Sequence, residues 1–296
     1  MKIDQIPAEY ANGSYVNVGI GAVQKVAFGN SLPVAFICGP CAIESRDLAF
    51  RTAEAIKRIG ERQKVGVVYK SSFDKANRTS VESRRGLGIE EGLRVLQEVR
   101  QEFQLPVLTD IHTAEQASIA AEVVDIVQIP ALLCRQTDII SAAASTRCVV
   151  NIKKGQFLSP EEMLQVAAKI KSFGKIDVLL TERGTSFGYN NLVSDFRALP
   201  ILATAQFPVV FDATHSVQLP GAAGSSTSGK REFVEVLTRA AVAVGVAGVF
   251  METHPDPDRA ISDGPNMVPL EKLEQLIASL RIIDDISKST VYAGIR

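Results

Sequence analysis

The chain has 296 residues, of which 46% are hydrophobic and 22% charged, so it can bury a large core as one α/β barrel or as two ordinary domains. Its net charge of −1 gives no overall field that would attract nucleic acid or a membrane surface, and no apolar run approaches the ~20 residues of a membrane span. The N-terminus lacks a basic stretch followed by an apolar run, and four cysteines in such a chain favour free thiols or a ligand over disulfides. We therefore expect a cytoplasmic protein that holds any anionic ligand with a local cluster of Lys and Arg.

Residues 1–33 do not share the pattern of the rest of the chain. The segments VNVGI and VQKVAF flank Gly21 and alternate apolar with polar residues, which predicts a small β-hairpin. This hairpin would close the bottom of a barrel formed by residues 34–296. No low-complexity linker divides those residues, so we expect one catalytic domain there.

Short apolar runs recur from residue 34 onward, each followed by a stretch with helical spacing. Such runs are typical of strands that are buried on both faces in a parallel sheet. The predicted strands are residues 34–40, 65–73, 106–111, 126–131, 149–154, 177–183, 208–215 and 248–254. Helices are predicted at 46–60, 90–103 and 159–173, the last starting with Ser159 as N-cap and Pro160 at the first helical position.

Eight strand–helix units in roughly 260 residues match the size of a (β/α)8 TIM barrel. A doubly wound open sheet is the alternative, but no GxGxxG follows the first strand, which weakens a dinucleotide-binding version. The Gly- and Ser-rich residues 219–230 follow the seventh strand, and their composition predicts a mobile loop.

Polar and ionisable residues collect where the predicted strands end, which is where the active site of a TIM barrel lies. The cations among them are Lys70, Lys75, Arg78, Lys153, Lys154 and Arg183. Any one lysine could be an ordinary surface charge, but the set follows the strand register. Phosphate and carboxylate groups are the ligands that suit such a cluster.

A second group contains possible metal ligands. Cys41, His215, Glu252 and Asp263 follow strands one, seven and eight, which are neighbours in a closed barrel. A thiolate, an imidazole and two carboxylates suit Zn, Fe, Mn or Co. Taken alone, an isolated cysteine such as Cys41 is more often a small buried hydrophobic residue than a ligand.

The other cysteines and the known catalytic motifs give no competing site. Cys38 lies inside a strand, and Cys134 and Cys148 have no ligand partners nearby in the sequence pattern, so we interpret them as packing residues. The sequence contains no GxSxG, Walker A or HExxH motif, which disfavours a serine hydrolase, a P-loop NTPase and a zincin.

At these residues the sequence resembles the 3-deoxy-D-manno-octulosonate 8-phosphate synthase family, from about residue 34 to residue 282. The segments that carry the resemblance are GPCAIES (39–45), KSSFDKANRTS (70–80), TDIH (109–112), QIPALLCRQTD (128–138), NIKKGQF (151–157), ERGTSFGYNNLVSD (182–195), FDATHSVQLPG (211–221) and METHPDPDRAISDG (251–264). The resemblance implies a transferase that condenses phosphoenolpyruvate with D-arabinose 5-phosphate and water for lipopolysaccharide biosynthesis, releasing phosphate. A related synthase that uses erythrose 4-phosphate typically has a KPRTS-type segment where this chain has KANRTS (75–80).

The resemblance also bears on the metal. The metal-independent branch of that family has Asn at the position of Cys41, so the cysteine implies the metal-dependent branch. The implied ligands are Cys41, His215, Glu252 and Asp263. The identity of the metal stays open, as does its role in orienting the aldehyde or activating water.

Further roles follow from the same resemblance. Lys153 and Arg183 are expected to hold the phosphate of phosphoenolpyruvate, with Lys70 and Lys75 near its carboxylate or the reacting centre. The sugar phosphate is expected to bind a second set: Asn77, Arg78, Thr79 and Ser80. These residues would reach in from a neighbouring subunit of a homotetramer.

The remaining site residues are expected to line the pocket or to act on the new alkoxide. Asp110, His112 and Gln128 belong to the lining, and His112 or Lys75 is the expected proton donor. Two alternatives stay open, namely a synthase for another aldose phosphate and a catalytically silent barrel that senses phosphosugars.

Overall fold

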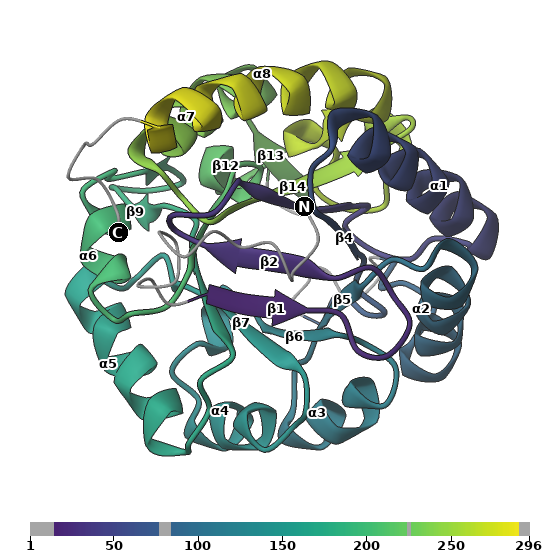
Figure 1. Cartoon of the computed structure of the whole chain (residues 1–296), viewed down its shortest axis with the longest axis horizontal. Coiled ribbons are helices and arrows are strands. Elements are labelled where there is room, and N and C mark those ends of the chain that lie inside the picture. Colours follow the sequence, from purple (N-terminus) through teal and green to yellow (C-terminus); the bar gives the residue numbers. More distant parts are fainter. Residues whose placement is uncertain (1–14, 77–83, 224–225, 290–296) are drawn as a thin grey trace.

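The computed structural model describes residues 15–76, 84–223 and 226–289, and the eight expected strand–helix units form a closed parallel barrel inside a ring of helices (Figure 1). The barrel strands are β3 (Ala35–Gly39), β4 (Val67–Lys70), β5 (Val107–Asp110), β6 (Ile126–Ile129), β7 (Val149–Lys153), β8 (Val178–Glu182), β11 (Val209–Asp212) and β14 (Gly248–His254). β14 pairs with both β3 and β11, which closes the sheet on itself. The predicted (β/α)8 architecture is therefore confirmed.

A helix follows each barrel strand. The helices are α1 (Arg46–Gln63), α2 (Ile89–Phe103), α3 (Ala114–Ala121), α4 (Thr137–Ala144), α5 (Pro160–Ser172), α6 (Ala198–Ala203), α7 (Val234–Val244) and α8 (Leu270–Ser289). The predicted start of α5 is confirmed: Ser159 Oγ accepts from the Glu162 amide while the Glu162 carboxylate accepts from the Ser159 amide, and Pro160 occupies the first turn. Among the described residues, no helix is long and apolar enough to cross a membrane.

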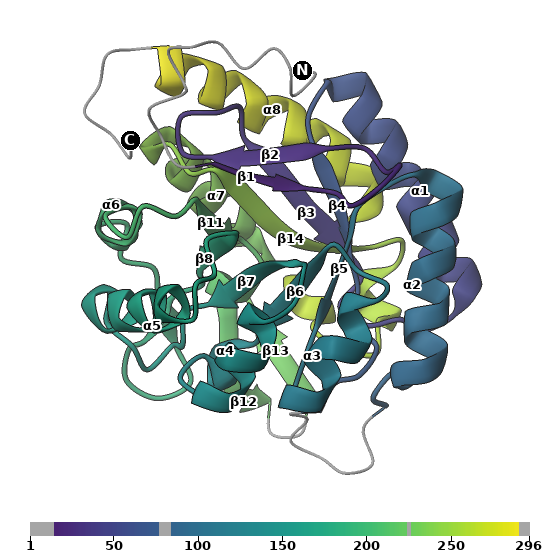
Figure 2. The same ribbon diagram turned by 60° about the horizontal axis from the view of Figure 1, so that its bottom comes forward.

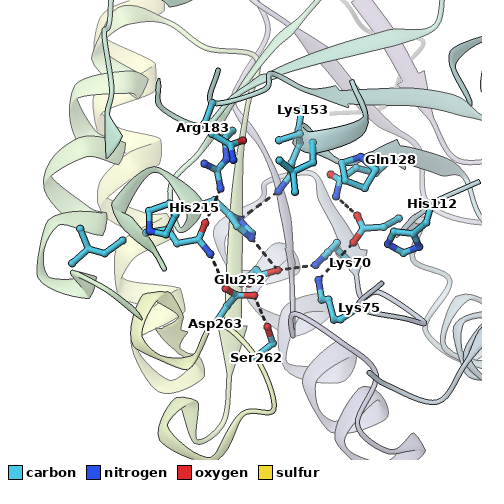
Figure 3. Close-up of a pocket in the computed structure, with 18 of the residues that line it drawn as sticks. Lys70, Lys75, His112, Gln128, Lys153, Arg183, His215, Glu252, Ser262 and Asp263 are labelled. Atoms are coloured by element: carbon cyan, nitrogen blue, oxygen red, sulfur yellow. Dashed lines mark hydrogen bonds and ion pairs between the residues drawn. The ribbon is translucent and has the colours of Figure 1, made fainter. Parts of the chain in front are cut away.

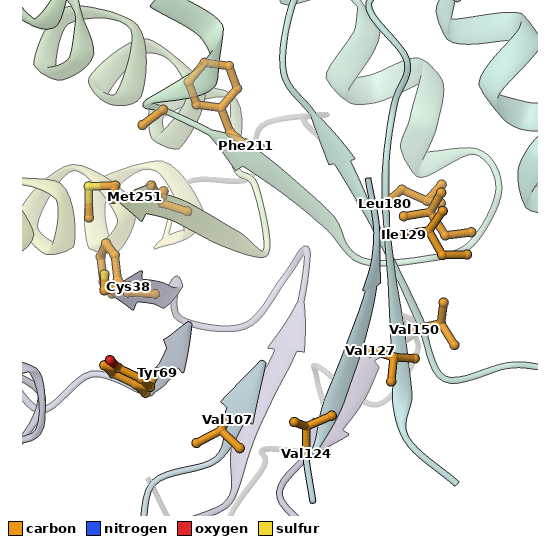
Figure 4. Packing of buried hydrophobic residues seen from close by; sticks show 14 of the residues in the cluster. Cys38, Tyr69, Val107, Val124, Val127, Ile129, Val150, Leu180, Phe211 and Met251 are labelled. Carbon is orange, nitrogen blue, oxygen red and sulfur yellow. The ribbon is translucent and has the colours of Figure 1, made fainter. Parts of the chain in front are cut away.

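Side chains alternate between the two faces of each strand, so the barrel has an inner and an outer core. The outer core lies between strands and helices and includes Cys38, Tyr69, Val107, Val127 and Met251 (Figure 4). The inner core receives one apolar side chain from each strand: Ile37, Val68, Leu108, Ile126, Val149, Leu179, Val210 and Phe250. This inner ring fills the middle of the barrel, so the barrel is a packed core without an open channel.

The predicted N-terminal hairpin is also present, as β1 (Tyr15–Val18) paired antiparallel with β2 (Val26–Gly29). It lies across one mouth of the barrel (Figures 1 and 2), and four of its side chains pack against the inner ring: Val16, Val18, Val26 and Phe28. Because the hairpin covers the mouth where the strands begin, it leaves the opposite mouth for ligands.

A buried carboxylate, Asp125, ties this hairpin to the barrel. It accepts hydrogen bonds from the amides of Ile20 (2.7 Å) and Val107 (3.0 Å) and from Arg100 Nε (2.9 Å). One side chain thus joins the hairpin turn, the start of β5 and the end of α2.

Two short hairpins at the other mouth were not predicted as strands. β9 (Thr185–Ser186) pairs with β10 (Leu192–Val193), and β12 (Gln218–Ala223) pairs with β13 (Ser226–Gly229). The second hairpin contains most of the segment 219–230, for which composition predicted a mobile loop; backbone pairing gives this Gly- and Ser-rich segment a regular form that its composition does not indicate.

Candidate active site

A ring of mostly polar side chains lies one layer above the apolar inner ring, two residues further along each strand. Its members are Gly39, Lys70, Asp110, Gln128, Asn151, Thr181, Asp212 and Glu252. All but the glycine are polar or charged, and all of these are 6% exposed or less. Burial of this many polar groups is costly unless each is paired, so the ring marks a site rather than a filler layer.

Above this ring, a cavity of about 260 Å³ opens toward the ends of the strands (Figure 3). Lys70 and Lys153 extend into it, each paired with a carboxylate of the polar ring. Lys70 Nζ lies 2.8 Å from Glu252 Oε1, and Lys153 Nζ lies 2.5 Å from Asp212 Oδ2. The two ion pairs hold both ammonium groups in place at the floor of the cavity.

Arg183 is the cation of the cavity that has the most unused hydrogen-bonding capacity. Its Nη2 donates to Gln218 Oε1 at 2.8 Å, whereas its Nε and Nη1 are buried with no hydrogen-bond partner in the described part of the chain. A buried guanidinium with two unpaired donors is a strong binding group for phosphate or carboxylate.

On the other side of the cavity, Asp110 is surrounded by cations. Burial opposes its ionisation, but Lys70 and Lys75 hold the pKa of the carboxyl well below its usual value. Lys75 Nζ lies 3.6 Å from Asp110 Oδ2, and although burial opposes its charge, the surrounding anions hold the pKa of Lys75 above the usual value. Nearby His112 has its pKa lowered, mainly by burial, so its imidazole is neutral near pH 7.

Three predicted metal ligands come together beside Lys70. Ligand atoms of Cys41, Glu252 and Asp263 all lie within 4.8 Å of one another, and all three residues are buried. Cys41 Sγ donates to Asp263 Oδ2 at 2.8 Å, and Glu252 Oε2 is a buried oxygen with no hydrogen-bond partner among residues 15–76, 84–223 and 226–289. Burial raises the pKa of the Cys41 thiol, so its conversion to a thiolate requires a cation at this position.

His215, the fourth predicted ligand, lies at the edge of this group. Its Nδ1 is 2.9 Å from Asp212 Oδ2, while its Nε2 faces Glu252 at 3.9 Å. A carboxylate on Nδ1 fixes the tautomer that leaves Nε2 free, which is the usual arrangement of a metal-binding histidine. The donor set of one sulfur, one imidazole nitrogen and carboxylate oxygens fits a divalent transition metal.

The structure brings most of the predicted site residues to one cavity. Its lining includes Lys70, Lys75, Asp110, His112, Gln128, Lys153, Arg183, His215, Glu252 and Asp263. The predicted residues Asn77, Arg78, Thr79 and Ser80 lie outside the described residues.

The prediction that Lys154 belongs to this cluster of cations is wrong. Its Nζ is buried and donates to main-chain oxygens of Leu158 (3.0 Å) and Gly184 (3.3 Å) and to Thr185 Oγ1 (3.0 Å). Adjacent residues of a strand point to opposite faces, so Lys153 and Lys154 cannot both face the cavity. Lys154 instead fastens the loops after β7 and β8.

Two polar residues of the site, Asp212 and Gln218, were given no role from the sequence. Asp212 orients His215 and pairs with Lys153, and Gln218 connects Arg183 to Asp263, to which its Nε2 donates at 3.2 Å. Asp212 stands at the end of a predicted strand, which was a usable signal. Gln218 follows a 3₁₀ turn, and no periodicity marked it.

Comparison with known proteins places these features in context. The family described as the DAHP synthetase I family matches residues 12–288. A protein of Rhodopseudomonas palustris (strain BisB5) named 2-dehydro-3-deoxyphosphooctonate aldolase is 59% identical over 284 residues, which cover 96% of this chain and 99% of that protein. A protein of the same name from Brucella ovis is 59% identical over 267 residues, covering 90% of this chain and 96% of that protein.

Proposed function

We propose that this chain, which belongs to the DAHP synthetase I family, condenses phosphoenolpyruvate with D-arabinose 5-phosphate and water. The products are 3-deoxy-D-manno-octulosonate 8-phosphate, a precursor for lipopolysaccharide, and inorganic phosphate. The observation that carries this function is the near full-length similarity to proteins named 2-dehydro-3-deoxyphosphooctonate aldolase. The cavity agrees with it, because two anionic substrates need the cations that line it.

Arg183 is the proposed primary contact for the phosphate of phosphoenolpyruvate. Its two unpaired donors support this role, whereas Lys153 already shares its charge with Asp212. Lys153 then adds positive charge at the phosphate, and Lys70 and Lys75 face the carboxylate or the reacting carbon. Binding in this geometry holds the enol carbon against the aldehyde, and such positioning can supply several kcal/mol of the barrier.

The reaction requires charge stabilisation at two atoms. When C3 of phosphoenolpyruvate attacks the aldehyde carbon, negative charge develops on the aldehyde oxygen and positive charge on C2. Water then adds at C2, and phosphate leaves with cleavage of the C2–O bond. Lys75 keeps its proton to a higher pH than a free lysine, so it suits a fixed positive charge beside the new alkoxide. His112, the other proton donor expected from the sequence, is neutral near pH 7 and would have to take up a proton before giving one to the alkoxide.

The metal-dependent form of this chemistry is also proposed, with Cys41, His215, Glu252 and Asp263 as the ligands. The unpaired Glu252 oxygen and the tautomer fixed on His215 support it. A bound divalent ion would supply a Lewis acid that either orients the aldehyde or lowers the pKa of a water molecule. Zn, Fe, Mn and Co all suit this donor set.

A cytoplasmic homotetramer is the proposed state of the protein. The four cysteines are all free thiols, which supports a reducing compartment. Exposed apolar side chains follow three successive barrel strands, β6, β7 and β8, and support an interface near the cavity mouth: Leu132, Phe157, Phe187 and Tyr189. The sugar phosphate site would be completed there by Asn77, Arg78, Thr79 and Ser80 of a neighbouring subunit.

Phosphate release from phosphoenolpyruvate, assayed with a panel of aldose phosphates, tests the function directly. We expect rapid release with D-arabinose 5-phosphate and little with erythrose 4-phosphate. Release with another sugar phosphate alone would indicate a sibling synthase, and no release with any of them would indicate a sensor.

Separate substitutions are expected to distinguish the two phosphate sites. Arg183→Ala should raise the KM for phosphoenolpyruvate, and Arg78→Ala should raise the KM for the sugar phosphate. Losing a charge-assisted hydrogen bond costs about 1.5–3 kcal/mol, or roughly one to two orders of magnitude in binding. Steady-state kinetics with each substrate varied in turn measures both values. An Arg78→Ala variant with a raised KM for phosphoenolpyruvate only would contradict this division.

The hairpin β12–β13 is proposed to act as a lid over the cavity. Leu219, Pro220 and Gly221 line the cavity, and the hairpin starts three residues after His215. A closed lid would exclude bulk water while positive charge develops at C2. Shortening the hairpin by several residues at its tip should lower kcat while leaving the metal content and the melting temperature unchanged. If kcat and KM were unchanged in the shortened variant, the hairpin would not act as a lid and would only connect β11 to α7.

A further inference from the structure

A chain of hydrogen bonds runs around one side of the polar ring, from β8 to β5. Thr181 Oγ1 donates to Asn151 Oδ1 at 2.6 Å, and Asn151 Nδ2 donates to Gln128 Oε1 at 2.7 Å. Gln128 Nε2 in turn donates to Asp110 Oδ1. All four side chains are at least 94% buried, since none is more than 6% exposed.

The chemistry of the end member fixes the direction of every bond in the chain. An ionised Asp110 can only accept, so Gln128 must turn its NH₂ group toward it and its carbonyl oxygen toward Asn151. Asn151 must then present its own NH₂ group to Gln128, which leaves its oxygen facing Thr181. Thr181 ends the chain because a hydroxyl can donate to that oxygen.

A second, shorter arm reaches the other oxygen of the same carboxylate. Lys75 Nζ donates to Ser72 Oγ at 3.0 Å, and Ser72 Oγ donates to Asp110 Oδ2. Asp110 is therefore the common acceptor of two donor arms that approach from opposite sides. Neighbouring hydrogen bonds that point the same way polarise one another, so each arm favours the ionised carboxylate.

We infer that Thr181 and Asn151 are positioning residues of this site, which act through Gln128 to hold Asp110 ionised and in one orientation beside Lys75. A purely structural layer would be apolar, as the ring directly beneath it is, with Val149 and Leu179 on the same two strands. The polar side chains of Asn151 and Thr181 instead extend the chain of hydrogen bonds, in which every donor points toward Asp110.

The orientation of Asp110 matters because cations face it from several elements. Lys70, Lys75 and Lys153 all act on its charge, and the neutral imidazole of His112 lies beside them. If the carboxylate turned or took up a proton, these cations would lose the anion that balances them when no substrate is bound. The fixed carboxylate therefore sets the field in which the substrate anions bind.

The decisive comparison uses Thr181→Val, which keeps the β-branched shape but removes the terminal donor. Asn151 then loses the donor that faces its oxygen, so the amides of Asn151 and Gln128 turn over more easily once Asp110 takes up a proton. We expect kcat/KM for phosphoenolpyruvate to fall by up to about a hundredfold, the cost of a misplaced site group. The acid limb of the pH profile of kcat/KM should move to higher pH, because protonation of Asp110 is then easier.

Two controls separate positioning from packing. Thr181→Ser retains the hydroxyl and should restore both kcat/KM and the acid limb. Thr52→Val removes a buried hydroxyl from α1 that has no hydrogen-bond partner among the residues described, and it should change neither. Asn151→Asp should move the acid limb further than Thr181→Val, because a carboxylate at 151 forces Gln128 to turn its oxygen toward Asp110.

The outcomes bear on this inference and on the proposed function separately. The kinetic readout rests on the proposed synthase activity, so a wild-type protein that releases no phosphate from any aldose phosphate would refute that function. A wild-type protein that turns over, together with a Thr181→Val variant that has a lower melting temperature but an unchanged kcat/KM and pH profile, would refute the positioning role. If Asn151→Asp does not fold, the Thr181 pair alone decides.

Discussion

Removing the divalent metal with a chelator is expected to abolish phosphate release from phosphoenolpyruvate, and adding Mn, Fe, Co or Zn to restore part of it. The expectation follows from the buried group of Cys41, Glu252 and Asp263, in which Glu252 Oε2 has no hydrogen-bond partner within the described part of the chain. Metal content per chain, measured by mass spectrometry alongside turnover, tests the prediction. Full activity in protein that contains no metal would falsify the assignment.

Cys41→Asn gives a finer test of the same site. It recreates the residue of the metal-independent branch, so we expect weaker metal binding with residual activity, because the cations still position both substrates. The affinity should drop by more than about a hundredfold, which is the upper range for losing an outer-shell partner of a metal. Cys38→Ala is the matched control, because Cys38 is also buried but faces the outer core. Loss of all activity in a folded Cys41→Asn variant would mean that Cys41 does more than hold the metal.

Asp125→Ala is expected to produce the largest loss of stability among single substitutions at the closed mouth. The side chain accepts from two backbone amides and from Arg100, and its removal leaves Arg100 without its buried counterion. Breaking a buried pair by removing one partner costs about 3–5 kcal/mol, a large share of the roughly 5–15 kcal/mol that stabilises a domain. Urea unfolding at fixed protein concentration measures the change.

The control for this prediction is Asp138→Ala. Asp138 is exposed in the first turn of α4, where an acidic residue contributes only about 0.3–1 kcal/mol. Because the hairpin covers the mouth opposite the cavity, KM values measured on the folded Asp125→Ala protein should match those of the wild type. If the urea midpoint of Asp125→Ala equalled that of Asp138→Ala within error, the hairpin would be held by its apolar contacts alone.

The sequence predicted the barrel because buried parallel strands leave apolar runs that stand out between amphipathic helices. Each predicted strand is present, with ends that differ by a few residues, as at 65–73, where only Val67–Lys70 is a strand. The end of a strand depends on where its neighbour stops offering hydrogen bonds, which no local pattern records. The hairpin β12–β13 escaped prediction for a related reason, since its strands pair through the backbone and its Gly- and Ser-rich sequence shows no alternation of apolar and polar residues.

The site was predicted by strand ends and by resemblance, and both signals have a defined limit. Position at a strand end does not say which face a side chain takes, so Lys154 was grouped with Lys153 although it fastens two loops on the other face. Strand alternation could have separated them. Asn151 and Thr181 were passed over because an amide and a hydroxyl inside an apolar run attract no attention until their partners are known.

Closure of the barrel has a consequence for the order of events during synthesis. β3 is the first barrel strand to leave the ribosome and β14 is the last, and they lie side by side only in the finished sheet. Cys41 follows the first strand, whereas Glu252 and Asp263 belong to the last unit. A nascent chain that stops short of residue 252 therefore carries the thiol without either carboxylate. The three residues of this group thus come together only late in synthesis. A truncated chain has Cys41 but lacks the two carboxylates that lie beside it in the folded protein.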